Sequence, residues 1–248
     1  MAATGDHHVL DLPPAYREVG LREFGDAYAK AIEIAASAGA GTLVWVRRFD
    51  LVEAAVVLEP EEPLASARRA LFAGMNAAAD ALAAHCPPEK PLSFAWPDSI
   101  LLDGGLVGGG RLAWPAGAAE GQPPAWLVFG LMLRSTVHAA RRPDAAHKER
   151  TTLEDEGFEV LDARELIASF SRHLMVHLDR WQADGFAQVG ADYLARLGPE
   201  RGPRQAILAN GDLVIHPQQQ GRAPGRRSLL EGLAKCEWLD PETQEPWL

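Results

Sequence analysis

The sequence is poor in cysteine, in basic charge and in long apolar runs, and each shortage excludes a class of protein. Only two cysteines, Cys86 and Cys236, occur among the 248 residues, so the sequence indicates no disulfide framework and no thiolate metal site. The 24 Lys and Arg residues face 34 Asp and Glu residues, for a net charge of -10. This balance argues against sequence-independent binding to nucleic acid, whose phosphates require a basic surface.

The sequence also shows neither the pattern of a membrane helix nor that of a signal peptide. No run approaches the roughly 20 apolar residues that a membrane helix needs. The first residues do not show a basic stretch followed by an apolar one, which is the pattern of a signal peptide. We therefore expect a soluble, cytoplasmic protein with no membrane partner and no nucleic-acid partner.

The composition is that of an ordinary folded protein, with 47% hydrophobic and 23% charged residues. The length suffices for one α/β-sized domain and a small appendage. From Gly198 onward Gly, Pro, Gln and Arg become frequent. We therefore expect a main domain over residues 1–198 and a small domain containing a β-hairpin over residues 199–248.

Hydrophobic periodicity and turn residues predict most of the secondary structure. Phe24, Tyr28 and Ile32 lie at helical spacing, and Asp162 can cap a later helix. The Asn210-Gly211 pair predicts a hairpin turn. The expected helices cover residues 21–37, 64–85, 163–183 and a further stretch to 197, and the expected strands cover 42–49, 54–58, 126–134, 206–208 and 213–215. The polar stretch 139–155 is expected to be an exposed loop.

The most specific pattern runs from Phe94 to Trp114. Residues 99–102 form an apolar strand, Asp103-Gly104-Gly105 forms a tight turn, and a return strand begins at Leu106. Gly108, Gly109 and Gly110 then lie inside the return strand. Glycine within a strand marks a close approach to the backbone. That approach is made either by a bound ligand or by a tightly packed neighbouring element.

The residues of this pattern, in this order, resemble the core hairpin of the biotin protein ligase and lipoate–protein ligase superfamily. Biotin protein ligases have Lys-Trp-Pro-Asn-Asp, a strand, a turn and a Gly-Gly strand that lies along the vitamin. Trp96, Pro97 and Gly109 match this pattern, with Asp98 in place of Asn and Ser99 in place of Asp. The run from Trp181 to Phe186 is similar to a later Trp-Gln…Gly-Phe junction of those enzymes. The resemblance implies an α+β fold, in which a mixed, mainly antiparallel sheet carries packed helices and a small β-containing region follows.

The resemblance also implies a chemistry. Such ligases activate a carboxylic acid such as biotin or lipoate with ATP and Mg²⁺, and then transfer the acyl group to a lysine of a carrier protein. A homodimer is a further expectation, because members of the family often dimerise. By position in the pattern, the ligand-binding residues would be Trp96, Pro97, Ser99, Gly108, Gly109 and Gly110.

The sequence departs from this family where phosphates would bind. Ala95 occupies the position of a lysine that contacts the acyl-adenylate, and Leu106 that of a second lysine. The Gly-Arg-Gly-Arg-Arg-Gly loop that folds over the adenylate is missing or reduced to a tight turn within residues 46–53. Most of the cations that this chemistry needs are therefore absent.

Four charged residues are candidates for the remaining chemistry. Arg47 and Arg48 could reach a phosphate, although exposed arginines are more often plain surface residues. Arg111 interrupts the apolar glycine-rich strand, so a functional role and a structural ion pair are equally weighted. Asp98 either acts as a base or orients a ligand, or it caps the turn. Arg111 and Asp98 are thus the candidate catalytic residues.

Other candidate motifs are weaker. His173 and His177 are four residues apart on a predicted helix, but the glutamate of a zinc-protease signature is absent, so a structural role is favoured. Neither cysteine lies in the motif of the octanoyl transferase branch, which uses a cysteine nucleophile. Two functions stay open: a divergent ATP-dependent ligase, and a catalytically degenerate protein that binds a small acid or a carrier protein without ATP chemistry.

Overall fold

The computed structural model describes residues 9–87, 90–137, 149–158, 162–198, 204–217 and 223–247. Its centre is a seven-stranded sheet with the strand order β1-β2-β3-β7-β6-β5-β4. Along the chain these strands are β1 (Arg17–Leu21), β2 (Thr42–Val46), β3 (Leu51–Leu58), β4 (Leu92–Ala95), β5 (Ser99–Leu102), β6 (Gly105–Ala113) and β7 (Leu127–Arg134). Among these seven described strands, β1 and β2 pair in parallel and the other neighbours are antiparallel. The expected mixed, mainly antiparallel sheet is confirmed.

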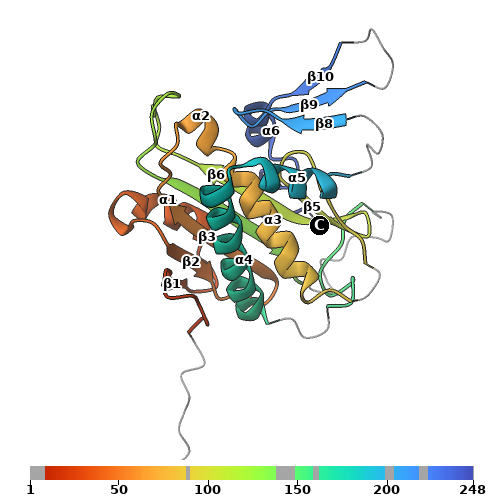
Figure 1. The fold of residues 1–248 in the computed structure, drawn as a ribbon. Coiled ribbons are helices and arrows are strands. Elements are labelled where there is room, and N and C mark those ends of the chain that lie inside the picture. The colour runs from red at the N-terminus through yellow and green to blue at the C-terminus, as the bar shows by residue number, and fades with distance from the viewer. Residues whose placement is uncertain are drawn as a thin grey trace, which may run out of the picture.

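Helices cover both faces of this sheet (Figure 1). Helix α1 (Ala27–Ala38) packs its alanines Ala27, Ala31 and Ala35 on one face. The opposite face is covered by α3 (Ala70–Ala83), α4 (Ala163–Asp184) and α5 (Ala187–Arg196), which follow the short α2 (Leu64–Ala67). No helix among the described residues is long and apolar enough to cross a membrane.

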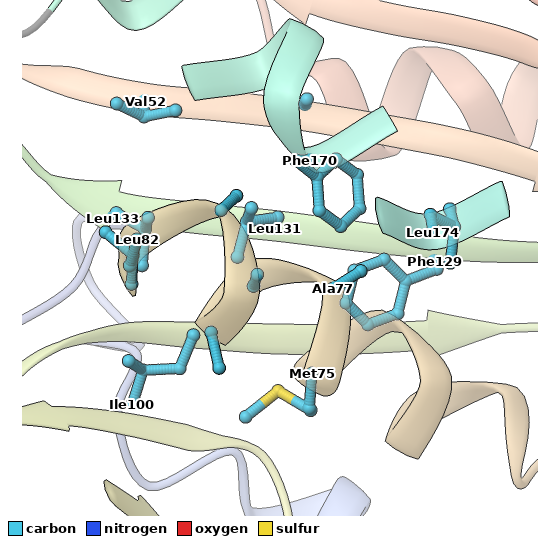
Figure 2. Packing of buried hydrophobic residues seen from close by; sticks show 14 of the residues in the cluster. Val52, Met75, Ala77, Leu82, Ile100, Phe129, Leu131, Leu133, Phe170 and Leu174 are labelled. Atoms are coloured by element: carbon cyan, nitrogen blue, oxygen red, sulfur yellow. The ribbon is translucent and has the colours of Figure 1, made fainter. Parts of the chain in front are cut away.

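The core under α3 and α4 is built from aromatic and aliphatic side chains (Figure 2). Phe129 of β7 is fully buried and lies 5.9 Å from Phe170 of α4, measured between ring centroids. Gly74 of α3 has no side chain, and a Cβ atom added there would overlap the Phe129 ring. The glycine thus lets α3 approach the sheet closely.

Helix ends follow local sequence signals. The Asp26 side chain accepts a hydrogen bond from Ala29 N at the start of α1, and Asp162 does the same for Arg164 N at the start of α4. The two helices end at Gly39 (φ 76°) and Gly185 (φ 82°). Glycine adopts this left-handed conformation without strain.

Three expectations about secondary structure are wrong. The first helix begins at Ala27 rather than residue 21, because residues 17–21 pair with β2 as a strand and Phe24 is 99% exposed. The helix expected over 64–85 is interrupted at Arg68 and Arg69. The strands β4 and β10 were not expected. Most of the loop expected over 139–155 lies outside the described residues.

A second, three-stranded sheet follows the main one and lies above it in Figure 1. It contains β8 (Arg204–Ile207), β9 (Leu213–His216) and β10 (Gly225–Arg227), all antiparallel. The Asp212 side chain accepts hydrogen bonds from Arg226 and from Leu229 N. It thereby joins this sheet to α6 (Leu229–Lys235). We use the term α6 segment for residues 229–247.

The two histidines of α4 take part in a structural network between helices. His177 is buried, and its Nε2 lies 2.7 Å from Asp80 Oδ2 on α3. Asp80 also accepts a hydrogen bond from Arg196 of α5, and His173 Nδ1 lies 4.0 Å from Asp80 Oδ2. Burial acts to raise the pKa of Asp80, but His177 and Arg196 outweigh it and hold the pKa below its usual value. The described residues contain no group of three or more His, Cys, Asp or Glu side chains that could hold a metal ion.

The packing of α3 against β7 gives a first prediction. Replacement of Gly74 by Ala raises helix propensity, yet the new methyl group overlaps the Phe129 ring. We expect Gly74→Ala to lower the free energy of unfolding by about 1–3 kcal/mol. Chemical denaturation measures this change, with Gly121→Ala as the control because a Cβ atom there meets nothing within 4 Å. Equal stability of the two variants would contradict this account of the core.

Candidate functional site

The Trp-Pro turn joins the main sheet to the helices. The Trp96–Pro97 peptide bond is cis, and the Pro97 carbonyl accepts a hydrogen bond of 2.9 Å from the Tyr193 hydroxyl of α5. The Trp96 ring lies 5.6 Å from the Phe72 ring and 6.1 Å from the Tyr193 ring, measured between centroids. These aromatic contacts fix the start of β5.

The glycines of β6 are covered by protein on both faces of the sheet. A Cβ atom on Gly110 would lie 2.9 Å from Met75 Sδ, on the face under α3. A Cβ atom on Gly109 would lie 2.5 Å from Nε1 and 2.6 Å from Cδ1 of Trp238, on the opposite face. Gly108 has a φ of 152° and lies against the backbone of Met132 in β7. Packed side chains and backbone make the close approaches that the glycines predict.

Strand register places several polar residues on the face that Gly109 presents to Trp238, which we call the ligand face. Glu53 pairs with Met132, and Met132 with Gly109; the neighbouring row is Ala55, Gly130 and Arg111. Alternate residues of a strand share a face. Gly109, Arg111, Gly130 and Glu53 therefore belong to the ligand face.

Arg111 lies at the centre of this face. Its guanidinium carbon is 4.3 Å from the centroid of the Tyr28 ring of α1. Tyr28 in turn lies on Gly130, where a Cβ atom would overlap its ring. No hydrogen bond or ion pair of Arg111 occurs among the described residues. Arg111 therefore makes a cation–π contact with Tyr28, and the structural ion pair that the sequence left open is not found among the described residues.

The two arginines after β2 point to different places. Arg47 is exposed, with its guanidinium 5.8 Å from the Trp45 ring centroid. Arg48 donates two hydrogen bonds to Asp50, of 2.9 and 2.7 Å, and one of 2.6 Å to Glu245. Only Arg48 is therefore next to the α6 segment.

Asp98 and Ser99 lie at the edge of the ligand face. Ser99 Oγ lies 3.4 Å from Asp98 Oδ1, and the Asp98 backbone carbonyl accepts a 2.8 Å hydrogen bond from Gly110 N. Asp98 Oδ2 is buried without a hydrogen-bond partner. Burial raises the pKa of Asp98 from 3.8 to about 7 against the opposing effects of Ser99 and Trp238. A carboxyl group with this pKa can give or take a proton near neutral pH.

A second buried carboxyl group, Glu53, lies on this face and was not among the expected site residues. Glu53 Oε1 accepts a 2.6 Å hydrogen bond from Ala27 N, the first residue of α1. Burial raises the pKa of Glu53 to about 7, and the Ala27 hydrogen bond opposes this shift. The signal was present in the sequence, because Glu53 is a charged residue inside the apolar run Leu51–Leu58.

Arg134, at the end of the apolar strand β7, is another buried charged residue that was not among the expected site residues. It is buried and donates hydrogen bonds of 3.2 and 3.1 Å to Glu245 Oε2 and one of 2.7 Å to the Pro246 carbonyl. Glu245 therefore bridges Arg134 and Arg48. Nothing local in the sequence indicates this contact, because Glu245 is far along the chain.

The described residues do not fit a nucleotide triphosphate on this face. Strands β2 and β3 are joined by residues 47–50 only, which confirms that the arginine-rich loop is reduced to a tight turn. Ala95 ends β4 without a charge, and Leu106 packs beside Trp238. Arg48 and Arg134 are already paired with carboxylates. A triphosphate would meet too few uncommitted cations for this chemistry.

A separate cavity of about 580 Å³ lies on the other face of the sheet. It is lined mainly by apolar side chains, including Tyr16, Val56, Leu127 and Trp181, with Glu59 and Glu61 among its lining. None of the site residues expected from the sequence lines it. The cavity and the ligand face are therefore two distinct places in the fold.

A model of the biotin/lipoate A/B protein ligase family matches residues 12–195. The chain belongs to this family. A biotin–[acetyl-CoA-carboxylase] ligase of Paracoccus denitrificans is 29% identical over 181 residues, which are 69% of this chain and 71% of that protein.

Solved structures of the family share the fold. A biotin protein ligase-like protein of unknown function from Silicibacter sp. TM1040 has a TM-score of 0.78 and 22% identity, over 91% of this chain and 99% of that one. The biotin protein ligase from Aquifex aeolicus has a TM-score of 0.63 and 14% identity, over 86% and 99%. A further structure of the Aquifex enzyme, in complex with biotin and ATP, has a TM-score of 0.61 and 15% identity, over 87% and 96%. The ligase fold is therefore retained in this family member.

The buried carboxyl group of Asp98 gives a pH-dependent prediction. Its pKa is higher in the folded than in the unfolded chain, so its contribution to stability is present at low pH and is lost as the pH rises toward and past 7. Asp98→Asn removes the charge and restores the family's residue. We expect it to stabilise the protein by about 1–3 kcal/mol at pH 8 and to have little effect at pH 4.

Thermal unfolding at the two pH values measures this difference. Asp11→Asn is the control, because Asp11 is fully exposed. The same shift in melting temperature at both pH values would show that burial of the Asp98 charge is not responsible.

Proposed function

We propose that this chain is a degenerate member of the ligase family that binds a small carboxylic acid of the biotin, lipoate or fatty-acid type without ATP chemistry. The observation that supports this proposal best is the loss of cations around an otherwise retained hairpin. Trp96, Pro97 and Gly109 are present, whereas the arginine-rich loop is reduced to residues 47–50 and both lysine positions are apolar.

Arg111 is the residue that we assign to the carboxylate of the acid. It lies on the ligand face, is partly exposed and makes only a cation–π contact among the described residues. Arginine binds a carboxylate through two parallel hydrogen bonds. The role proposed for Gly108, Gly109 and Gly110, together with Trp96, Pro97 and Ser99, is to form the surface along which the body of the acid lies. Arg47 and Arg48 remain proposals for the rim of this surface.

A second candidate function is supported by the relatives. The Paracoccus protein is a biotin ligase, and the Aquifex enzyme has been crystallised with biotin and ATP. As a working ligase, this chain would need ATP and Mg²⁺, a biotin-like or lipoate-like acid, and a carrier protein with an acceptor lysine. Asp98 would then be its candidate proton-transfer group. A homodimer and a cytoplasmic location remain proposals under either function.

Calorimetric titration separates the two functions. We expect biotin, lipoate or octanoate to bind with an affinity that Mg²⁺-ATP does not change, and no pyrophosphate to be released. Arg111→Ala should weaken binding about 10- to 100-fold, as for the loss of a charged hydrogen bond. Arg172→Ala, an exposed arginine of α4, is the control.

The opposite result is equally clear. Release of pyrophosphate together with acid binding that strengthens with ATP would establish a ligase and reject the proposal. Failure of all three acids to bind would reject both functions for these ligands.

A further inference from the structure

The ligand face is covered by the chain itself. Trp238 of the α6 segment is fully buried and lies directly on Gly109. It packs with Leu51, Met132 and Leu106, the last of which stands where the family has a lysine. An aromatic ring of the protein therefore occupies the glycine surface proposed for the acid.

The indole N–H of Trp238 faces the buried Asp98 carboxyl group. Trp238 acts to lower the pKa of Asp98, against the larger effect of burial. Trp238 Nε1 and Asp98 Oδ2 have no other hydrogen-bond partner among the described residues. The α6 segment therefore covers the Asp98 carboxyl group as well as Gly109.

The acidic end of the segment is held at the rim. The Glu245 carboxylate lies 2.6 Å from Arg48 Nη2 and 3.1 Å from Arg134 Nη2. One carboxylate is thus shared by two guanidinium groups, and these charge-assisted hydrogen bonds anchor the end of the segment. The segment also has the complementary charge, because residues 229–247 contain five acidic residues and one lysine.

The start of the segment contacts the Trp-Pro turn. A Cβ atom on Gly232 of α6 would lie 2.7 Å from Cδ and from Cγ of Pro97. The three parts of the α6 segment therefore contact the turn, the glycine strand and the arginine rim.

We propose that the α6 segment is an intramolecular cap, seated on the ligand face in place of an acidic ligand and displaced when that face is used. The ring of Trp238 occupies the surface proposed for the apolar body of the acid. Glu245 anchors the cap to Arg48 and Arg134, while the carboxylate of the acid remains assigned to Arg111. The inference rests on the proposed function for the identity of the ligand, but displacement of the cap can be measured without any ligand.

Cys236 provides the measurement. It is the residue at which α6 ends and is half-buried, and burial raises its thiol pKa to about 12, which slows its reaction with disulfide reagents while the cap is seated. In a Cys86→Ser background it is the only thiol of the chain. We expect Glu245→Gln and Trp238→Ala to raise the rate of its reaction with a disulfide reagent at least tenfold. Glu242→Gln, an exposed acid of the same segment, should leave the rate unchanged.

Far-UV circular dichroism and thermal unfolding of each variant exclude global unfolding as the cause. Labelling of Cys236 at the rate of global unfolding in every variant would overturn the proposal, because the segment would then be a fixed part of the fold. A tenfold acceleration in both cap variants with the secondary structure retained supports it.

A titration with biotin, lipoate and octanoate separates the two proposals. If both hold, Glu245→Gln binds an acid at least tenfold more tightly than Glu242→Gln, and the acid accelerates labelling of Cys236. Faster labelling in the cap variants with no acid bound by any of them supports the cap and rejects the function. Equal acid affinity in the two variants, with labelling unaffected by the acid, supports the function and overturns the cap.

Discussion

A strip of the central sheet without side chains determines what can lie on it. Met75 and Phe129 lie against Gly110 on one face of the sheet. Trp238 lies against Gly109 on the other face, and Tyr28 lies against Gly130. Protein interiors are close-packed, so each missing side chain has to be replaced by a neighbouring group. Each of these neighbours lies against the sheet at a glycine of β6 or β7.

The electrostatics of the ligand face follow from this close covering. Glu53 and Asp98 are held away from water, and burial raises the pKa of both to about 7. The arginines at the rim are instead paired with carboxylates of the chain. Positive charge at the rim is thereby neutralised by the chain itself, whereas Arg111 has no carboxylate partner among the described residues.

The parts of the fold that depend on local sequence could be predicted, and the parts that depend on distant contacts could not. The helix capped by Asp162 and the turn at Asp103-Gly104 were expected from neighbouring residues alone. The strand β1 was not, because it exists through parallel pairing with β2 across a whole helix. The apolar stripe that included Phe24 placed the start of the first helix too early, because periodicity alone does not show where a helix begins.

The site was predictable to the same extent. The Trp-Pro turn and the glycine run predict a surface that some group approaches closely, and the glycines of β6 do have such neighbours, while the site itself stays a prediction. What approaches it is Trp238, which is far along the chain and has no sequence signal of its own. Glu53 and Arg134 could have been found as charges inside apolar strands. Their partners Ala27 and Glu245 required the structure.

The contact of the α6 segment with the main sheet has a consequence for any shortened form of the protein. A fragment ending at residue 198 would retain all seven strands and α1, α3 and α4, but Leu51 and Met132 would lose Trp238 as their cover. The strands would then present an apolar patch beside Arg134, which would lose Glu245, while Arg48 would keep Asp50. Such a surface favours self-association, so the fragment would form aggregates at concentrations where the full chain stays dispersed.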